Sequence, residues 1–118
     1  MKYLTTVEEF KQVLNDSSPK ELEDGTMTNA KLSIFDFFTD WCGPCNRFAP
    51  IYEELEKENK EVGFYKVNVE GEGEELGEFQ EIYSLPTLKF FKGDKLIDSL
   101  TGAQPKDKMQ SMIDLYKN

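Results

Sequence analysis

The amino-acid sequence predicts one α/β domain in which a mixed β-sheet is flanked by helices on both faces. Residues Leu32–Phe38 form a nearly continuous apolar run, which is typical of a strand buried on both faces of a sheet. Strand-like and helix-like patterns alternate along the chain, and the last two strand-like runs are joined by the hairpin turn Lys92-Gly93-Asp94-Lys95. The predicted order is β-α-β-α-β-α-β-β-α, and the length of 118 residues suits a single domain, 1–118.

A first helix is predicted from about residue 7 to 15, after the first strand of this order. Residues Thr6–Glu9 fit a capping box, in which a threonine cap is answered by a glutamate three residues later. Phe10, Val13 and Leu14 then follow at helical spacing. From about residue 16 to 31 the periodicity is lost among proline, glycine, serine and charged residues. This composition predicts a long surface loop with a short helical turn near Lys20–Asp24.

The remaining elements are predicted from the spacing of apolar residues. An amphipathic helix runs to about Lys60, with an apolar face made of Phe48, Ile51, Tyr52 and Leu55. A strand at Phe64–Val69 is followed by a helix at Glu72–Tyr83 that places Leu76, Phe79 and Ile82 inward. Strands at Thr87–Phe91 and Leu96–Leu100 form the hairpin. The last helix begins at Pro105 and has one apolar face, made of Met109, Met112, Ile113 and Tyr116.

Composition and charge exclude several classes of function. The formal net charge is -9 and the pI is about 4.5, so nucleic acids and anionic membrane surfaces are poor partners. The chain has no histidine, which excludes Cys/His zinc modules and Cys-His catalytic pairs, and no metal site is expected. The N-terminus lacks the apolar run of a signal peptide, and no apolar stretch approaches the length that spans a bilayer. We therefore expect a soluble, cytoplasmic protein.

The clearest chemical signal is the segment Trp41-Cys42-Gly43-Pro44-Cys45, between the buried strand and an amphipathic helix. Two cysteines separated by two residues can close a disulfide and store two electrons reversibly. Backbone N–H groups and the helix dipole favour the thiolate of Cys42 at the helix start, whereas Cys45 lies about one turn further in. Cys42 is the predicted nucleophile and Cys45 the less accessible, resolving cysteine. Half of a zinc site and an inert structural disulfide are the alternatives, and the zinc site has no second half here.

Asp36 and Lys66 are the other candidate catalytic residues. Asp36 lies inside the strand that is expected to be buried, where desolvation would raise its pKa and suit it to pass protons near neutral pH. The alternative is a structural aspartate that is satisfied by hydrogen bonds. Lys66 lies on the same face of its strand as Phe64, and a solvated strand lysine is the alternative there.

Three segments resemble the signatures of the thioredoxin family. Phe35–Cys45 resembles the active-site segment, Ser84–Leu88 the segment around a cis proline, and Thr101–Ala103 the glycine that borders the substrate groove. The resemblance implies the thioredoxin fold, a monomer and a protein-disulfide reductase without a bound cofactor. It also implies electrons from NADPH through thioredoxin reductase, and disulfide-containing targets such as peroxiredoxins or reductases.

The resemblance also assigns roles to single residues. Asp36 would assist the deprotonation of Cys45 through water, with Lys66 beside it. Pro86 would be cis and pack against the cysteine pair, although proline is also tolerated at the start of a strand for local reasons. Leu85 would offer its backbone to an extended substrate. A shallow apolar docking patch would consist of Trp41, Gly43, Pro44, Leu85, Gly102 and Ala103.

The surroundings of the cysteines predict a pair that donates electrons. Gly43 and Pro44 supply no cation, and Asp36 and Asp40 add negative charge, so the thiolate is less stabilised. The rival functions are a secretory disulfide isomerase or oxidase domain, and a binding or assembly module that docks through the long loop. The sequence departs from the family in that loop, at Asn46 and in the acidic stretch Glu70–Glu75, which is read as a solvated loop and helix start.

Overall fold

The computed structural model describes residues 1–118 and contains a five-stranded mixed sheet with four helices. The strands lie in the order β1-β3-β2-β4-β5. Strands β1, β3 and β2 are parallel, whereas β4 is antiparallel to both β2 and β5. The elements are β1 (Lys2–Tyr3), α1 (Val7–Ser17), β2 (Leu32–Phe38), α2 (Gly43–Glu58), β3 (Gly63–Asn68), α3 (Glu74–Phe79), β4 (Thr87–Lys92), β5 (Lys95–Thr101) and α4 (Lys106–Tyr116). The predicted order of elements is confirmed, with boundaries that differ by a few residues.

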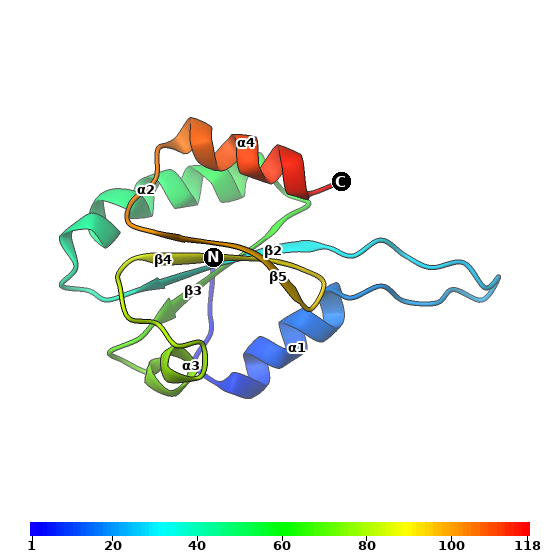
Figure 1. The fold of residues 1–118 in the computed structure, drawn as a ribbon, viewed down its shortest axis with the longest axis horizontal. Helices are drawn as coiled ribbons and strands as arrows, with labels where there is room; N and C mark the ends of the chain where they lie inside the picture. The colour runs from blue at the N-terminus through cyan, green and yellow to red at the C-terminus, as the bar shows by residue number, and fades with distance from the viewer.

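Helices cover both faces of the sheet, as the buried character of Leu32–Phe38 predicts (Figure 1). Helices α2 and α4 enclose one apolar cluster, to which β2 contributes Ile34, and helices α1 and α3 enclose the other, which contains Phe35 and Phe37. Every residue of β2 is buried because the strand is central and its side chains alternate between the two clusters. None of the four helices has the length and apolar character needed to cross a membrane.

Helix α1 begins with the predicted capping box. The Thr6 hydroxyl accepts from the backbone N–H of Glu9, and the Glu9 carboxylate accepts from the backbone N–H of Thr6. These bonds satisfy N–H groups that the first helical turn leaves without a partner. Hydrogen bonds donated to the Glu9 carboxylate by Thr5, and to a smaller extent by Thr6, lower the pKa of Glu9. The predicted position of the helix start is confirmed.

The segment after α1 is an extended, hairpin-like arm, and the short helical turn predicted near Lys20–Asp24 is wrong. Glu21 and Met27 form an antiparallel bridge, and the chain reverses at Asp24 and Gly25, which has a φ of 86°. At the base, Lys31 N–H donates to the Ser17 carbonyl (2.8 Å). We call residues 19–30 the arm; it protrudes from the molecule, whose principal extents are 50 × 31 × 20 Å (Figure 1).

Helix α3 is shorter than predicted, and one of its three inward residues points elsewhere. Leu76 is fully buried, but Phe79 is 49% exposed and meets α1 at the edge of the Phe10 ring and beneath the Lys11 ammonium. The helix ends at Phe79, and Glu81 soon afterwards adopts a positive φ of 56°. Gly77 lets α3 lie close to the sheet, because a Cβ there would be 2.7 Å from the Val69 side chain. The close approach of α3 brings the following loop next to the end of β2.

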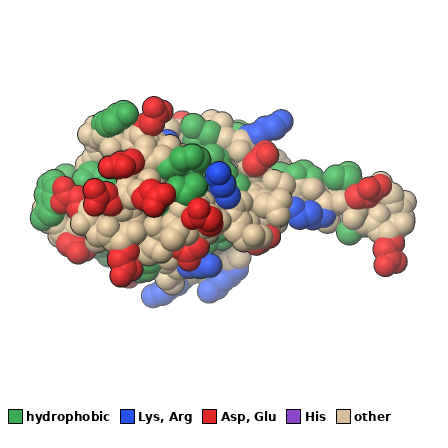
Figure 2. Space-filling view, turned by 90° about the horizontal axis from the view of Figure 1, so that it is seen from below, with side chains coloured by type: hydrophobic (Ala, Val, Ile, Leu, Met, Phe, Trp, Pro, Cys, Tyr) green, Lys and Arg blue, Asp and Glu red, His purple; other side chains and the backbone are tan.

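The acidic composition is unevenly distributed over the surface. Figure 2 views the face that carries α1 and α3; aspartate and glutamate side chains gather at the end away from the arm, and others lie near the tip of the arm. The lysines visible on this face lie toward its middle and on the arm. The acidic end of the body, away from the arm, is also the end at which β2 leads into α2.

Candidate active site

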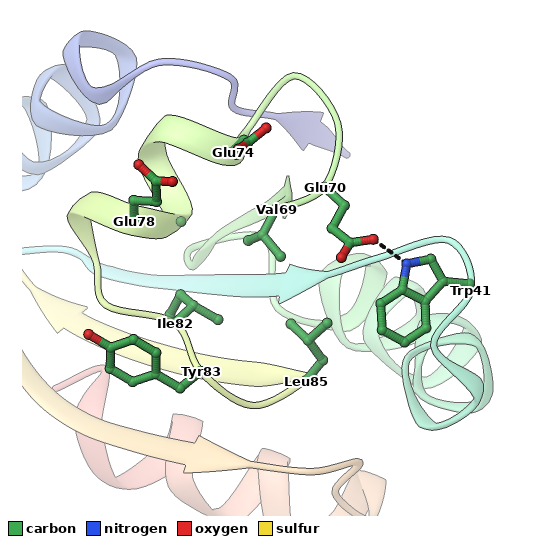
Figure 3. Close-up of a pocket in the computed structure, with 9 residues that line it drawn as sticks. Trp41, Val69, Glu70, Glu74, Glu78, Ile82, Tyr83 and Leu85 are labelled. Atoms are coloured by element: carbon green, nitrogen blue, oxygen red, sulfur yellow. Dashed lines mark hydrogen bonds between the residues drawn. The ribbon is translucent and has the colours of Figure 1, made fainter.

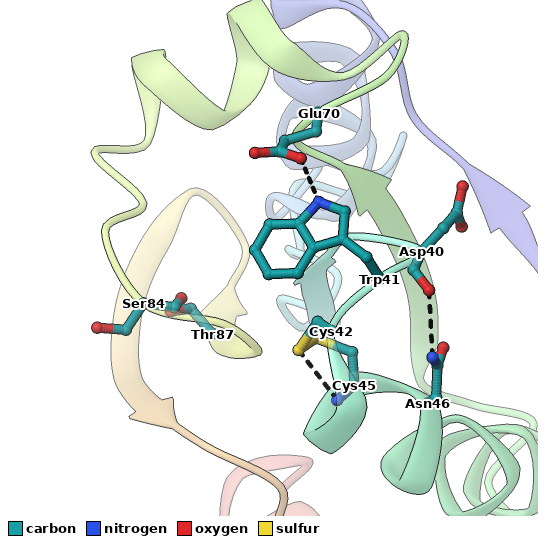
Figure 4. The surroundings of a disulfide bond; sticks show 8 residues. All are labelled: Asp40, Trp41, Cys42, Cys45, Asn46, Glu70, Ser84 and Thr87. Carbon is teal, nitrogen blue, oxygen red and sulfur yellow. Dashed lines mark hydrogen bonds between the residues drawn. A yellow bond between two sulfur atoms is a disulfide. The ribbon is translucent and has the colours of Figure 1, made fainter.

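Two loops meet where β2 ends. One contains Trp41, directly before the cysteine motif, and the other contains Leu85, directly before β4 (Figure 3). Phe37 of β2 pairs with Thr87 of β4, so the register brings the start of β4 next to the cysteines. Trp41 is 68% exposed, as a place in a docking patch requires. Its indole N–H donates a hydrogen bond to the Glu70 carboxylate, which fixes the ring above this junction (Figures 3 and 4).

Cys42 and Cys45 form a disulfide at the N-terminus of α2, with their Cα atoms 5.2 Å apart (Figure 4). Cys42 is the N-cap residue, and its Sγ accepts a hydrogen bond from the backbone N–H of Cys45 (3.2 Å). Pro44 lies in the first turn, where the missing N–H of proline costs nothing. The two cysteines are buried to nearly the same extent, 5% and 3% exposed, so exposure does not separate their roles. The N–H donated to Cys42 separates them, because it stabilises negative charge on that sulfur.

The peptide bond between Leu85 and Pro86 is cis, as predicted. Pro86 is buried, and its carbonyl accepts from the Gly102 N–H (2.8 Å), which links the loop to the end of β5. Gly102 has a φ of 88°, a conformation that favours glycine, and Ala103 after it is exposed. The Leu85 side chain packs against Phe38 and the two cysteines. Neither the N–H nor the C=O of Leu85 has a hydrogen-bond partner in the chain, so both are open to an extended peptide.

Asp36 is buried without any hydrogen bond. Its side chain is 1% exposed, and neither carboxylate oxygen accepts a hydrogen bond from the protein, which excludes an aspartate satisfied by other protein groups. Burial raises the pKa of Asp36 to about 7, and the positive charge of Lys66 opposes this rise. Asp36 lies on the sheet face that α2 covers, where burial and, to a smaller extent, the charge of Asp36 raise the pKa of Tyr52 of that helix. The structure therefore provides a proton acceptor that titrates near neutral pH beneath the helix that carries Cys45.

Lys66 is buried beside Asp36, and the alternative of a solvated lysine is wrong. It is 8% exposed and is the register partner of Asp36 in the parallel pair of β2 and β3. Lys66 forms no ion pair. Its ammonium lies 4.3 Å from the centre of the Phe38 ring and 5.7 Å from that of Tyr3. The rings hold the cation by cation–π attraction, and the Asp36 carboxylate has no ion-pair partner.

Two charged residues at the site were not found from the sequence. Glu70 was assigned to a solvated stretch, but it holds Trp41, and only the fold brings residues 29 positions apart together. Arg47 brings a cation close to Gly43, although Gly43 and Pro44 themselves supply none. A Cβ on Gly43 would lie 3.4 Å from the Arg47 guanidinium, which therefore folds back over the first turn of α2. The spacing of four residues within a helix is the signal that identifies Arg47.

The candidate docking residues lie around the disulfide. Trp41, Gly43 and Ala103 are exposed, and the others of the set are half-buried, namely Pro44, Leu85 and Gly102. Asn46 donates to the Asp40 backbone carbonyl (3.1 Å), which braces the turn that presents Trp41 (Figure 4). The site combines a cysteine pair that can store two electrons at a helix N-terminus, the unpaired backbone groups of Leu85 and the buried carboxyl of Asp36. This combination defines a thiol–disulfide oxidoreductase.

Comparisons with known proteins agree with this class. The model of the Thioredoxin family matches residues 3–115. A thioredoxin from Geodia cydonium is 41% identical over 102 residues, which cover 86% of this chain and 85% of the relative. Thioredoxin 1 of Plasmodium falciparum is 40% identical over 93 residues, 79% of this chain and 88% of the relative. The X-ray structure of Fasciola hepatica thioredoxin has a TM-score of 0.83 at 32% identity and covers 99% of this chain and 100% of that one.

The chain belongs to the thioredoxin family. The predicted fold is confirmed, and the chain is a thiol–disulfide oxidoreductase. Members of this family bind no cofactor themselves and are reduced by thioredoxin reductase.

Proposed function

We propose that the chain reduces disulfides in other proteins, with Cys42 as the nucleophile and Cys45 as the resolving cysteine. The observation that carries this assignment is the hydrogen bond from the Cys45 N–H to the Cys42 sulfur at the N-terminus of α2. In the reduced form the same N–H and the helix dipole stabilise a thiolate on Cys42. No corresponding N–H donates to Cys45.

The reaction transfers two electrons in two exchange steps. The Cys42 thiolate attacks one sulfur of the target disulfide, so that a mixed disulfide forms and the other target sulfur leaves as a thiolate. Asp36 accepts the proton of the Cys45 thiol through water, since its pKa of about 7 lets it hold or release a proton near neutral pH. The Cys45 thiolate then attacks the Cys42 sulfur, which releases the second target thiolate and leaves the pair oxidised. Lys66 is a positioning residue that acts through Asp36.

The target binds as an extended segment across the cis-proline loop. The open N–H and C=O of Leu85 support this role, because they can pair with the backbone of such a segment. Trp41, Gly43, Pro44, Gly102 and Ala103 would contact the side chains on either side of the target cysteine. Pro86 would fix the loop against the cysteine pair.

NADPH supplies the electrons in this proposal, through a thioredoxin reductase that reduces the oxidised pair. The targets are disulfides in proteins such as peroxiredoxins and reductases, and the protein acts as a cytoplasmic monomer. A net charge of -9 supports the monomer, because like charges oppose self-association.

The assignment of the two cysteines is tested by trapping. Cys45→Ser removes the second exchange step, so targets from a cell extract should remain covalently bound to Cys42. Cys42→Ser should trap nothing, because the nucleophile is absent. Non-reducing electrophoresis, with mass spectrometry of the proteins that dithiothreitol releases, measures both.

Two outcomes would contradict the proposal. Trapping by Cys42→Ser alone would show that the nucleophile is Cys45. Partners that both variants hold equally, and that dithiothreitol does not release, would show binding without exchange, as expected of an assembly module.

A further inference from the structure

A groove next to the disulfide has an acidic wall. The groove has a volume of about 590 Å³ and lies between Trp41, helix α3 and the loop before β4 (Figure 3). Its floor is apolar, with Val69, Ile82 and Leu85. Leu85 also packs against the cysteine pair, so the groove begins where the disulfide site ends.

Three glutamates and no basic residue line the groove. Glu74 and Glu78 lie one turn apart on α3, and Glu70 lies next to Trp41 (Figure 3). None of the three glutamates forms an ion pair. The lysines that reach α3 are engaged elsewhere, since Lys11 lies over the Phe79 ring and Lys89 donates to the Gln80 carbonyl. The negative charge of the groove is therefore not neutralised within the chain.

The three glutamates differ in their hydrogen bonds. Glu70 accepts the indole N–H of Trp41, so it positions that ring. Glu74 and Glu78 accept no hydrogen bond from any side chain, and both are exposed. Tyr83 closes the far end of the groove with a ring that is 87% exposed, which offers an aromatic face to a cation.

We propose that this groove selects disulfide partners in which an extended, arginine- or lysine-bearing segment flanks the reactive cysteine. The inference rests on the proposed function, since the segment that pairs with Leu85 would continue along the apolar floor. Its basic side chains would meet the carboxylates of Glu74 and Glu78, and an acidic segment would be repelled by them. The concentration of acidic groups at this end of the molecule attracts such a partner from a distance (Figure 2).

The test uses three synthetic peptide disulfides with the same backbone length. The residues that flank the cysteine are arginine in one peptide, glutamine in the second and glutamate in the third. The reduced protein should react faster with the arginine peptide than with the glutamate peptide, and the difference should shrink as salt is added. The double variant Glu74→Gln/Glu78→Gln should reduce this preference by about two- to fivefold for each glutamate removed. The glutamine peptide should react equally with both proteins.

A matched control changes the same number of charges elsewhere. Glu23 on the arm and Glu53 on α2 are exposed and form no ion pair, so Glu23→Gln/Glu53→Gln should keep the full preference. Peptides with serine in place of cysteine give a readout that needs no redox chemistry. Fluorescence anisotropy should show that the arginine peptide binds the wild-type chain more tightly than it binds Glu74→Gln/Glu78→Gln.

The outcomes separate the groove from the proposed function. If all three peptides are reduced at equal rates and the serine peptides bind equally, the groove does not select basic segments, although the chain is a reductase. If no peptide is reduced but the arginine peptide binds through Glu74 and Glu78, the reductase proposal fails and the groove stands. A preference that the Glu23/Glu53 control also loses would assign the effect to net charge and overturn the proposal.

Discussion

At the scale of single residues, the buried carboxyl of Asp36 lowers the stability of the fold and also provides an acceptor for a proton. Burial raises its pKa from the ordinary 3.8 to about 7. The folded chain then keeps a proton that the unfolded chain has lost, so stability falls as the pH rises from about 4 to about 7. Above pH 7 both states are ionised, and the full cost of a shift of this size, about 4 kcal/mol, is present. The same raised pKa lets the carboxylate accept the proton of a thiol.

Asp36→Asn should therefore raise stability and slow the chemistry. The free energy of unfolding at about pH 8 should rise by about 1–3 kcal/mol, because the buried amide, which also lacks a partner, cancels part of the gain. The gain should shrink toward zero below about pH 4, where the carboxyl is protonated in both states. Urea unfolding of the oxidised chain at several pH values measures the stability. Stopped-flow reduction of a disulfide should show a slower release of the second target thiol.

Lys66→Met tests whether the charge of Lys66 sets the pKa of Asp36. The ammonium opposes the rise of the Asp36 pKa, so its removal should shift the Asp36-dependent inflection of the rate to higher pH. A gain in stability by Asp36→Asn that is the same at every pH would contradict the argument, because only ionisation makes the cost depend on pH.

At the scale of elements, regular periodicity was predictable and local exceptions were not. The strand Leu32–Phe38, the capping box of α1 and the helix after Cys42 follow from patterns of a few neighbouring residues. The cysteine pair was predicted for the same reason. The sequence predicts a loop with a helical turn where the arm forms, because the antiparallel bridge of the arm pairs side chains that show no alternation. The exposure of Phe79 and the partners of Glu70 and Arg47 depend on how separate elements pack, which no local pattern records.

The arm should be dispensable for disulfide reduction. It leaves the fold at the start of β2, and the seven residues of that strand place its base about 20 Å from the cysteines. Ser17 and Lys31 are already joined by a backbone hydrogen bond, so three glycines in place of residues 19–29 should close the gap. We expect an unchanged rate of reduction for protein disulfides and a gain in stability of about 0.5–1 kcal/mol from the shorter loop.

A variant of full length separates the side chains of the arm from its length. Leu22 and Met27 are exposed apolar residues on the arm, and Leu22→Ser/Met27→Ser should leave activity and stability unchanged. Circular dichroism verifies the fold of each variant. A loss of activity in the folded, shortened chain would place the arm on the surface that binds the target or the reductase.

At the scale of the whole molecule, the redox equilibrium is a difference in stability between two folded forms. Reduction replaces the disulfide by a thiol and a thiolate, so charges around Cys42 decide how well the reduced form is tolerated. Arg47 and the N-terminus of α2 favour the thiolate. Asp36, Asp40 and Glu70 near the site, together with the net charge of -9, oppose it. The balance of charge is negative, so the pair should donate electrons.

The oxidised chain should therefore be more resistant to unfolding than the reduced chain. A thermodynamic cycle links folding and oxidation of the cysteine pair. If the folded chain favours the disulfide over the dithiol, the disulfide stabilises the fold, and the pair readily gives up electrons as a reductant. Urea unfolding near pH 7 should show a higher midpoint for the oxidised form, and titration with glutathione should give a potential below that of the glutathione pool. Arg47→Gln should lower this potential further, because a cation near the thiolate is lost, while Glu53→Gln should leave it unchanged. A higher urea midpoint for the reduced form than for the oxidised form would contradict this prediction. It would instead indicate a pair that accepts electrons, as an oxidase or isomerase requires.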